Sequence, residues 1–287
     1  MTYTLYLGDR SYSSWSLRAW LLREVWELPI DTIYVDFSAQ DVAAQLADAA
    51  PARTVPTLKT PEGAIISESL AIAEELATRF SDAPLWPRDP LARATARSLA
   101  SEMHAGFGPL REECPMNLRA AYSGVVPSEN VQADLRRLET IWASAMEATG
   151  GPWLCGDYSI ADAFYAPVAA RIAGYGLSVS EVADEYVSRH LSHLPFRRWR
   201  AMGLVKGEAL PWYRRDYPST DWPGPTPLAA NAVTNGPSVN DACPYSGDPV
   251  TDFLDFNGQT YGFCNPFCRD KTVADPEAWP KFMAIVR

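Results

Sequence analysis

Apolar and polar positions change period several times in the first 80 residues, which predicts alternating strands and helices. Residues 3–7 alternate as in a strand, whereas residues 14–27 carry apolar side chains at helical spacing, beginning with Leu17 and Trp20. A small mixed sheet covered by helices has this order of elements. The predicted elements are a strand over 3–7, a helix over 14–27, a strand over 31–36, a helix over 40–48, two strands within 55–67 that flank a turn at 61–63, and a helix over 69–79.

The rest of the chain predicts a helical domain followed by a small module. A proline-rich linker at 81–90 separates the first part, which has the element order of an α/β thioredoxin-like fold, from a helical pattern between Leu91 and Met202. A segment rich in Pro, Ser, Asn and Gly follows the helices and is expected to be a linker or a surface strap. The expected domains are 1–80 (thioredoxin-like), 91–216 (all-α), 217–240 (linker) and 241–287 (small module).

Composition and charge narrow the class of protein. The chain has 287 residues, of which 47% are apolar, so that it can bury a sizeable core. Its formal net charge of −10 and pI of about 4.8 disfavour nucleic acid and anionic membrane as partners, since both need a basic surface. No apolar run approaches the roughly twenty residues of a membrane span, and the N-terminus lacks the pattern of a signal peptide. We therefore expect a cytoplasmic protein with reduced thiols.

The hairpin within 55–67 combines strand pairing with a possible anion site. Pro56 follows an extended residue, where a cis peptide bond is possible; such a bond would turn the N–H and C=O groups of Val55 towards a ligand. Ser69 opens the next helix, where free backbone N–H groups and the helix dipole favour a carboxylate. The alternative is an ordinary hairpin that leads into a helix.

Several serines precede the first helical stripe, in the sequence Ser11-Tyr12-Ser13-Ser14-Trp15-Ser16. One of them is expected to cap the helix. A hydroxyl at a helix N-terminus can also donate a hydrogen bond to a bound anion, and the helix dipole helps a bound thiol to ionise. These serines are therefore either candidates for chemistry or simple capping residues.

Together these motifs resemble the glutathione transferase family, and the resemblance extends over residues 1 to about 215. It implies a glutathione site at Val55, Pro56, Glu68 and Ser69, in which the residue before the cis-proline pairs with the cysteinyl part of glutathione. The acidic residue and the serine would bind its γ-glutamyl end. The spacing of Ser159 and Asp162 resembles the family's capping box on the central helix of the second domain, a folding element. Residues 12–18 and 101–119 resemble one group of bacterial members.

The resemblance also implies a catalytic serine. Serine-type members place it five residues before an arginine of the first helix, and alignment on Arg18 puts Ser13 in that position. Ser14 is the second choice and Ser11 the third. A helix of the second domain would line the cleft opposite glutathione. The candidate substrate contacts are Tyr12, Trp15, His104, Phe107 and Arg111, with Met103 and Met116 beside them.

The last 45 residues hold three of the five cysteines. Cys264 and Cys268 are four apart and face the same way on a helical turn, and Cys243 can join them across a hairpin predicted at Asn257-Gly258. Three thiolates suit zinc or another soft metal ion such as copper. This segment resembles the metal-binding YHS/TRASH-type modules; the alternative is three free thiols in a docked lobe. The open candidates for a fourth ligand are Asp241, Asp248, Asp270 and a water.

The resemblance implies a glutathione S-transferase that uses a serine-stabilised glutathione thiolate on a small electrophile, aromatic or planar in shape. The reaction would be conjugation, thiolytic cleavage or isomerisation through a transient adduct. Family members associate as homodimers, so the same is expected of this chain. The rival interpretation is a non-catalytic protein of the same fold that binds metal or acts as a sensor.

Overall fold

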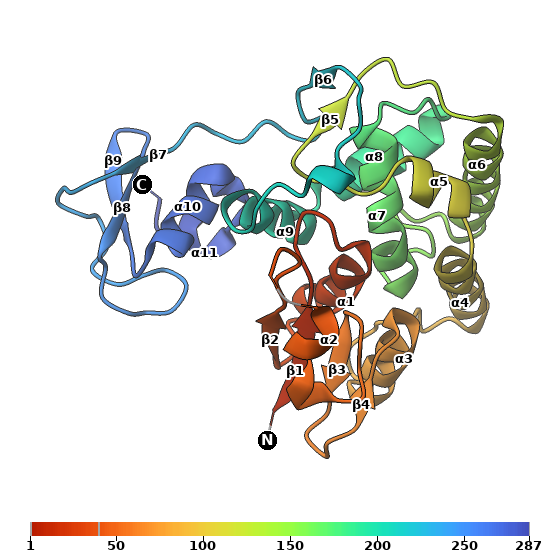
Figure 1. Ribbon diagram of the computed structural model, residues 1–287, viewed down its shortest axis with the longest axis horizontal. Coiled ribbons are helices and arrows are strands. Elements are labelled where there is room, and N and C mark those ends of the chain that lie inside the picture. Colours follow the sequence, from red (N-terminus) through yellow and green to blue (C-terminus); the bar gives the residue numbers. More distant parts are fainter. Residues whose placement is uncertain (1, 40, 287) are drawn as a thin grey trace. The chain divides into compact units, whose positions relative to one another are not determined.

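The computed structural model describes residues 2–39 and 41–286, and contacts divide the chain into two compact units (Figure 1). Unit 1 comprises Met1–Leu191 and Ala209–Pro223, and unit 2 comprises Ser192–Glu208 and Gly224–Arg287. The first expected domain and most of the second thus lie in one unit, whereas the segment Ser192–Glu208 of the second groups with the C-terminal module. The domain limits drawn from the sequence stay a prediction.

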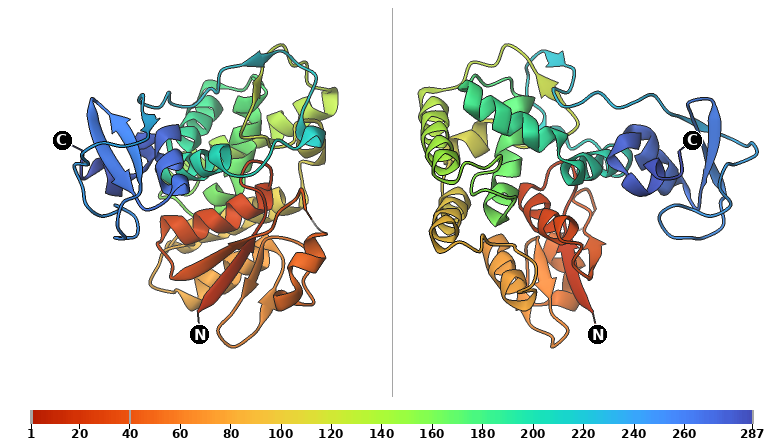
Figure 2. Two further views of the ribbon diagram at one scale, coloured as in Figure 1. Left: turned by 60° about the vertical axis from the view of Figure 1, so that its left-hand side comes forward. Right: turned by 180° about the vertical axis from the view of Figure 1, so that it is seen from behind.

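The first part of unit 1 is a four-stranded mixed sheet with helices on both faces. Its elements are β1 (Tyr3–Leu7), α1 (Ser14–Val25), β2 (Ile30–Tyr34), α2 (Val42–Gln45), the 3-10 helix η1 (Ala47–Ala49), β3 (Thr57–Lys59), β4 (Ile65–Ile66) and α3 (Ser69–Arg79). The strand order is β2-β1-β3-β4, with β1 parallel to β2 and antiparallel to β3. Helix α1 crosses one face of the sheet (Figure 2) and packs on α3. Tyr6 of β1 packs on the other face against Leu46 and Ala49, since neighbouring strand residues point in opposite directions.

This arrangement confirms the predicted thioredoxin-like fold class and the predicted order of elements. The peptide bond between Val55 and Pro56 is cis, as the sequence suggested. Residue 40, with which the predicted helix over 40–48 begins, lies outside the described residues; the helix itself starts at Val42.

The remaining part of unit 1 is helical, as predicted. Its elements are α4 (Pro90–Ala105), α5 (Gly108–Glu113), β5 (Ala121–Tyr122), α6 (Glu129–Thr149), α7 (Ile160–Gly174), α8 (Glu181–Ser192), the 3-10 helix η2 (Pro211–Tyr213) and β6 (Ser219–Thr220). Helix α7 is buried along almost its whole length and packs on both α1 and α4, so it joins the helical part to the sheet part. The carboxylate of Asp162 accepts hydrogen bonds from the N–H and O–H of Ser159, which confirms the predicted capping box.

Unit 2 is a three-stranded antiparallel sheet with a helical layer. Its elements are α9 (Leu194–Val205), β7 (Asn231–Val233), β8 (Asp252–Phe256), β9 (Gln259–Phe263), α10 (Pro266–Ala274), the 3-10 helix η3 (Pro276–Ala278) and α11 (Pro280–Met283). The hairpin at Asn257-Gly258 is present between β8 and β9. Strand β7, which comes from the segment expected to be a linker, pairs with β8.

Helix α9 is part of the core of unit 2. It packs on α10, and the guanidinium of Arg197 binds both oxygens of Asp275 at 2.9 and 2.6 Å, in a pair whose side chains are 12% and 9% exposed. The C-terminal segment alone is short for an independent core, and the α9 helix supplies part of what it lacks. Within residues 2–39 and 41–286, no helix combines the length and the apolar character needed to cross a membrane.

Candidate functional site

A cavity of about 760 Å³ opens in unit 1 between the sheet part and the helical part. The sheet part contributes the start of α1, the cis-proline loop and the start of α3. The helical part contributes residues of α4, α5 and α7 and the segment around η2. The lining residues are Tyr12, Ser13, Ser14, Trp15, Phe37, Val42, Arg53, Thr54, Val55, Pro56, Ser67, Glu68, Ser69, His104, Gly108, Arg111, Glu112, Pro115, Met116, Arg171 and Tyr213.

Two serines at the start of α1 face this cavity in different hydrogen-bonding states. Ser13 is the N-cap: its hydroxyl accepts from the N–H of Ser16 at 3.3 Å and donates to the hydroxyl of Ser16 at 2.8 Å. Ser14 is the first helical residue, and its hydroxyl accepts a bond of 3.4 Å from the guanidinium of Arg171. The first backbone N–H groups of α1 lack an intrahelical partner, so this helix end attracts negative charge.

The start of α3 forms a second anion-attracting point in the same cavity. Glu68 is its N-cap, with no side-chain capping bond, and Ser69 is its first residue. The Ser69 hydroxyl is buried and has no hydrogen-bond partner within the described residues. A buried polar group without a partner is costly, which indicates that a ligand completes this site.

Arg18 of α1, Arg111 of α5 and Arg171 of α7 lie close enough to repel one another, and none has a paired carboxylate in the described part of the chain. Arg111 and Arg171 line the cavity. Arg18 is 1% exposed and Arg171 is 4% exposed, whereas Arg111 is half-buried over the ring of Trp15. Burial, together with repulsion from Arg171 and Arg111, lowers the pKa of Arg18 to about 9. Burial and the charge of Arg111 lower the pKa of Arg171 to about 10.

These guanidinium groups retain hydrogen-bonding capacity. The Nε and one terminal nitrogen of Arg18, and the Nε of Arg171, are buried without a partner among residues 2–39 and 41–286. Clustered buried cations are unfavourable unless an anion joins them. The arrangement therefore indicates a binding point for a negatively charged group.

His104 lies where the two halves of the cavity meet. Its Nε2 is 3.6 Å from a carboxylate oxygen of Glu68, and its Nδ1 is buried without a partner in the parts of the chain described. Burial and the nearby charge of Arg18 lower the pKa of His104, against the opposite effect of Glu68. The imidazole is therefore neutral at pH 7 and can exchange a hydrogen bond with a ligand.

The structure brings most of the predicted site residues together. Val55, Pro56, Glu68 and Ser69 line the same cavity as Ser13 and Ser14, and so do the predicted substrate contacts Tyr12, Trp15, His104, Arg111 and Met116.

Three candidates lie elsewhere. Ser11 and Met103 are completely buried outside the lining. Phe107 is also absent from the lining: it is 6% exposed, has a positive φ of 57° before α5 and packs its ring against Tyr165.

The site residues predicted from the sequence included neither Arg171 nor Tyr213, both of which line the cavity. Tyr213 stacks on Tyr12 at 4.7 Å between ring centroids, and the Tyr12 hydroxyl accepts from the N–H of Leu210 at 3.2 Å. The available signal for Arg171 was an arginine on a largely apolar helix, nine residues after Asp162 of the capping box.

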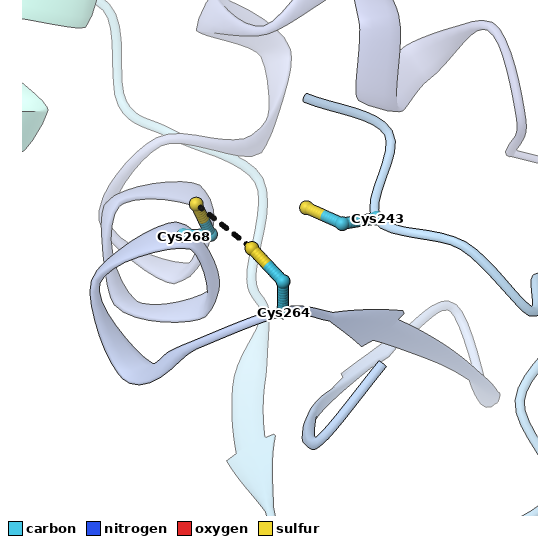
Figure 3. Close-up of side chains that lie close together, drawn as sticks. All are labelled: Cys243, Cys264 and Cys268. Atoms are coloured by element: carbon cyan, nitrogen blue, oxygen red, sulfur yellow. Dashed lines mark hydrogen bonds between the residues drawn. The ribbon is translucent and has the colours of Figure 1, made fainter. Parts of the chain in front are cut away.

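A separate cluster in unit 2 consists of Cys243, Cys264 and Cys268, whose sulfur atoms all lie within 4.8 Å of one another (Figure 3). The sulfur atoms of Cys264 and Cys268 are 3.9 Å apart, and the hydroxyl of Ser246 donates a hydrogen bond of 3.3 Å to the sulfur of Cys264. Burial alone would raise the pKa of Cys243, but backbone N–H groups after it lower that pKa to about 7. The cluster thus joins the three cysteines that the sequence suggested as metal ligands; none of the candidate aspartates belongs to it within the described residues.

Comparison with known proteins identifies the relatives of unit 1. Residues 12–79 match the model of the glutathione S-transferase N-terminal domain. A protein of Caenorhabditis elegans named probable maleylacetoacetate isomerase is 30% identical over 181 residues, which are 61% of this chain and 81% of that protein. The rat maleylacetoacetate isomerase is 27% identical over 180 residues, with the same two coverages of 61% and 81%.

The fold has counterparts among solved structures. A glutathione transferase homologue from Burkholderia, solved with bound glutathione, superposes with a TM-score of 0.54 at 24% identity and covers 71% of this chain and 98% of that one. The domain match, the extent of the nematode relative and the observed fold agree, and the chain therefore belongs to the glutathione transferase family of enzymes.

Proposed function

We propose that this enzyme adds the thiolate of glutathione reversibly to a small, carboxylate-bearing electrophile with a cis double bond and releases the trans isomer. The substrate would be maleylacetoacetate or a chemically similar unsaturated acid, as the names of the nematode and rat relatives suggest. The observation that carries the proposal is one cavity with two helix N-termini and the side chains of Arg111 and Arg171 in its lining. The buried Arg18 lies close enough to repel both, and none of these three arginines pairs with a carboxylate in the described residues. Each of these features favours a negative charge.

The sheet part of the cavity would hold glutathione. The hydroxyl and N–H of Ser69 can donate to the γ-glutamyl carboxylate at the start of α3, and the carboxylate of Glu68 can accept from the α-amino group. The backbone of Val55 would pair with the cysteinyl part beside Pro56. This pose puts the glutathione sulfur towards the start of α1.

The serines at the start of α1 would stabilise the thiolate. The Ser13 hydroxyl can turn from Ser16 to the sulfur, while Ser14 carries a hydroxyl hydrogen that is not needed for its bond to Arg171. The helix dipole and the charge of Arg171 add to this stabilisation. Thiolate attack on one carbon of the double bond leaves a single bond that rotates, and loss of the same thiolate restores the double bond in the trans form.

The helical part of the cavity would bind the electrophile. Arg111 and Arg171, which line the cavity, would bind its carboxylate, because a guanidinium can make a bidentate contact, and the charge of Arg18 nearby would add to the attraction. Tyr12, Trp15 and Tyr213 would form the flat walls around its conjugated system. Conjugation of glutathione without isomerisation is the alternative reaction at the same site.

Calorimetry of glutathione binding tests the first step of this proposal. We expect the wild type to bind glutathione and Ser69→Ala to lose most of that affinity. Ser128→Ala is a matched control, because Ser128 caps α6 at 3.2 Å outside the cavity. Equal binding by Ser69→Ala and the wild type would contradict the site. A wild type that binds glutathione but leaves cis-unsaturated acids unchanged would contradict the isomerase assignment.

We also propose two further properties that the sequence suggested. The enzyme would act as a homodimer; elution at the size of one chain in gel filtration would contradict this. Cys243, Cys264 and Cys268 would bind zinc or another soft metal ion, a proposal that rests on the spacing of their sulfur atoms. Metal analysis of the purified wild type and Cys264→Ser tests it, with Cys114→Ser as the control, since Cys114 is buried in unit 1.

A further inference from the structure

The late segment Ala209–Pro223 belongs to unit 1 and contributes to the wall of its cavity; we call it the strap. Its strand β6 pairs with β5, and the guanidinium of Arg215 donates to the carbonyls of Glu112 and Glu113 at 3.2 and 3.4 Å. The last carbonyls of a helix lack intrahelical partners, so the arginine satisfies the end of α5. The strap is thus fixed to a helix that itself lines the cavity.

The 3-10 helix η2 of the strap carries Tyr213 into the cavity lining. Its ring stacks on that of Tyr12, with 4.7 Å between the centroids and 29° between the planes. The N–H of Tyr213 donates to the carbonyl of Leu210 at 3.1 Å, and the N–H of Leu210 donates to the Tyr12 hydroxyl at 3.2 Å. Tyr12 directly precedes the two serines at the start of α1, so these contacts hold the ring of Tyr213 in the same cavity as those serines.

The hydroxyl of Tyr213 is a hydrogen-bond donor that has no partner among residues 2–39 and 41–286. Burial raises the pKa of Tyr213, and the charge of Arg171 acts in the opposite direction. Because the net shift is upwards, the phenol keeps its proton at pH 7. The phenol and the guanidinium lie close enough for their charges to interact, and both residues line the cavity. They offer a neutral donor beside a positive charge.

Thiolate addition to a double bond that is conjugated with a carbonyl group creates a charge for such a donor to stabilise. A sulfur lone pair forms the new C–S bond, and the π electrons of the double bond shift onto the carbonyl oxygen, so the adduct is an enolate. The carbon–carbon bond is now single and rotates. Return of the electrons expels the thiolate and leaves the trans double bond, with no net change in protons or oxidation state. A preorganised donor at the enolate oxygen lowers this barrier.

We propose that the Tyr213 hydroxyl donates a hydrogen bond to the enolate oxygen, so that Tyr213 is a catalytic residue and Arg215 is the positioning residue that holds it through the strap. The inference rests on the isomerase reaction proposed above and adds the group that stabilises its intermediate. The arginines of the lining hold the substrate carboxylate, the serines of α1 hold the sulfur, and Tyr213 receives the charge that moves between them.

Isomerisation of a cis unsaturated acid whose double bond is conjugated with a ketone, measured at saturating glutathione, tests this inference on the full-length protein. Tyr213→Phe keeps the aromatic ring and lacks the hydroxyl, so kcat should fall about hundredfold. The calorimetric Kd for glutathione and the pKa of its bound thiol, from ultraviolet titration, should stay at their wild-type values. Arg215→Met should lower kcat by a smaller factor. Trp212→Phe is the matched control, because Trp212 lies on the same η2, is 62% exposed and is outside the lining.

Two outcomes would overturn the role of Tyr213 and leave the isomerase intact: a wild-type kcat in Tyr213→Phe, or a fall in kcat that comes with a matching shift in the pKa of the bound thiol. The second result would mean that the substitution distorts the thiolate site. If Tyr213→Phe does not fold, a wild-type kcat in Arg215→Met overturns the inference in its place. A wild type that neither binds glutathione nor isomerises the keto acid would instead overturn the proposed function.

Discussion

Replacing Arg171 by methionine is expected to make the folded enzyme more stable and, at the same time, a poorer catalyst for acidic electrophiles. Arg171 is 4% exposed on α7, and its guanidinium bonds only to the Ser14 hydroxyl at 3.4 Å and to the carbonyl of Pro167 at 3.2 Å within the described chain. Its Nε has no partner there. A buried charge in this state opposes folding of the ligand-free protein.

The size of the effect follows from the pKa of Arg171. Burial and the charge of Arg111 lower it from 12.5 to about 10, which corresponds to about 3 kcal/mol at about 1.36 kcal/mol per pH unit. Methionine removes this penalty together with two modest hydrogen bonds worth about 1 kcal/mol each. The expected net gain in the free energy of unfolding at pH 7 is therefore about 1 kcal/mol.

The same substitution removes the proposed contact to the substrate carboxylate. A hydrogen bond between charged groups is worth about 1.5–3 kcal/mol, so kcat/KM for an unsaturated acid should fall about 10–150-fold. The methyl ester of the same acid lacks the charge and should lose much less. The ratio between acid and ester is thus the diagnostic quantity.

Urea unfolding and steady-state kinetics on the acid and its ester measure both effects. Arg137→Met is the control, because Arg137 is an exposed arginine of α6 that pairs with Glu102 at 2.7 Å. A destabilised Arg171→Met that loses activity equally on acid and ester would refute the reasoning and assign Arg171 a structural part.

The other predictions concern the thiolate, the cavity wall and the capping box. Ser13→Ala should raise the pKa of the bound glutathione thiol and lower kcat at least tenfold with little change in glutathione affinity; ultraviolet titration of the thiolate checks this, and Ser14→Ala should have the smaller effect. Gly8→Ala should lower glutathione affinity about tenfold in calorimetry, because the new methyl group would lie 2.3 Å from the Phe37 ring, which must then move in the cavity. Burial raises the pKa of Asp162 from 3.8 to about 6, so its contribution to stability is full below pH 4 and is lost as the pH rises through 6. The urea-unfolding difference between the wild type and Asp162→Asn should accordingly shrink by about 2 kcal/mol between pH 4 and pH 7; a difference that grows with pH would contradict this.

Local signals explain why the part of the cavity formed by residues 55–69 was predictable as a structure. The cis-proline, the hairpin and the start of α3 occupy fifteen consecutive residues, 55–69, and each follows from the types of its own neighbours. The capping box at Ser159 and Asp162 is local in the same sense. The sequence left several serines as candidates for the cap of α1. The hydrogen bonds between Ser13 and Ser16 in the structure identify Ser13 as that cap.

The helical side of the cavity depends on contacts between distant residues, which one sequence does not reveal. Arg171 meets Ser14 across 157 positions, and Tyr12 meets Leu210 across 198. Phe107 is aromatic, as expected of a contact to a planar substrate, but its backbone is left-handed and its ring packs against Tyr165 in the core. The pairing of β7 with β8 was equally hidden, because β7 has only three residues and little apolar pattern.

Several polar groups in and beside the cavity lack the partners that would stabilise the ligand-free fold, and all of them favour a negative charge. The start of α1 presents N–H groups, the start of α3 leaves a buried hydroxyl unpaired, and Arg18 and Arg171 are buried without counter-ions in the described chain. A chain with a net charge of −10 has ample carboxylates to pair with these groups. The lack of carboxylate partners is therefore specific to this site and does not reflect a shortage of acidic residues. An anionic ligand relieves each of these costs on binding, whereas a neutral ligand of equal size relieves none. The proposed pair of ligands, glutathione and an acidic electrophile, has this charge pattern, with a carboxylate at each end and a thiolate between them.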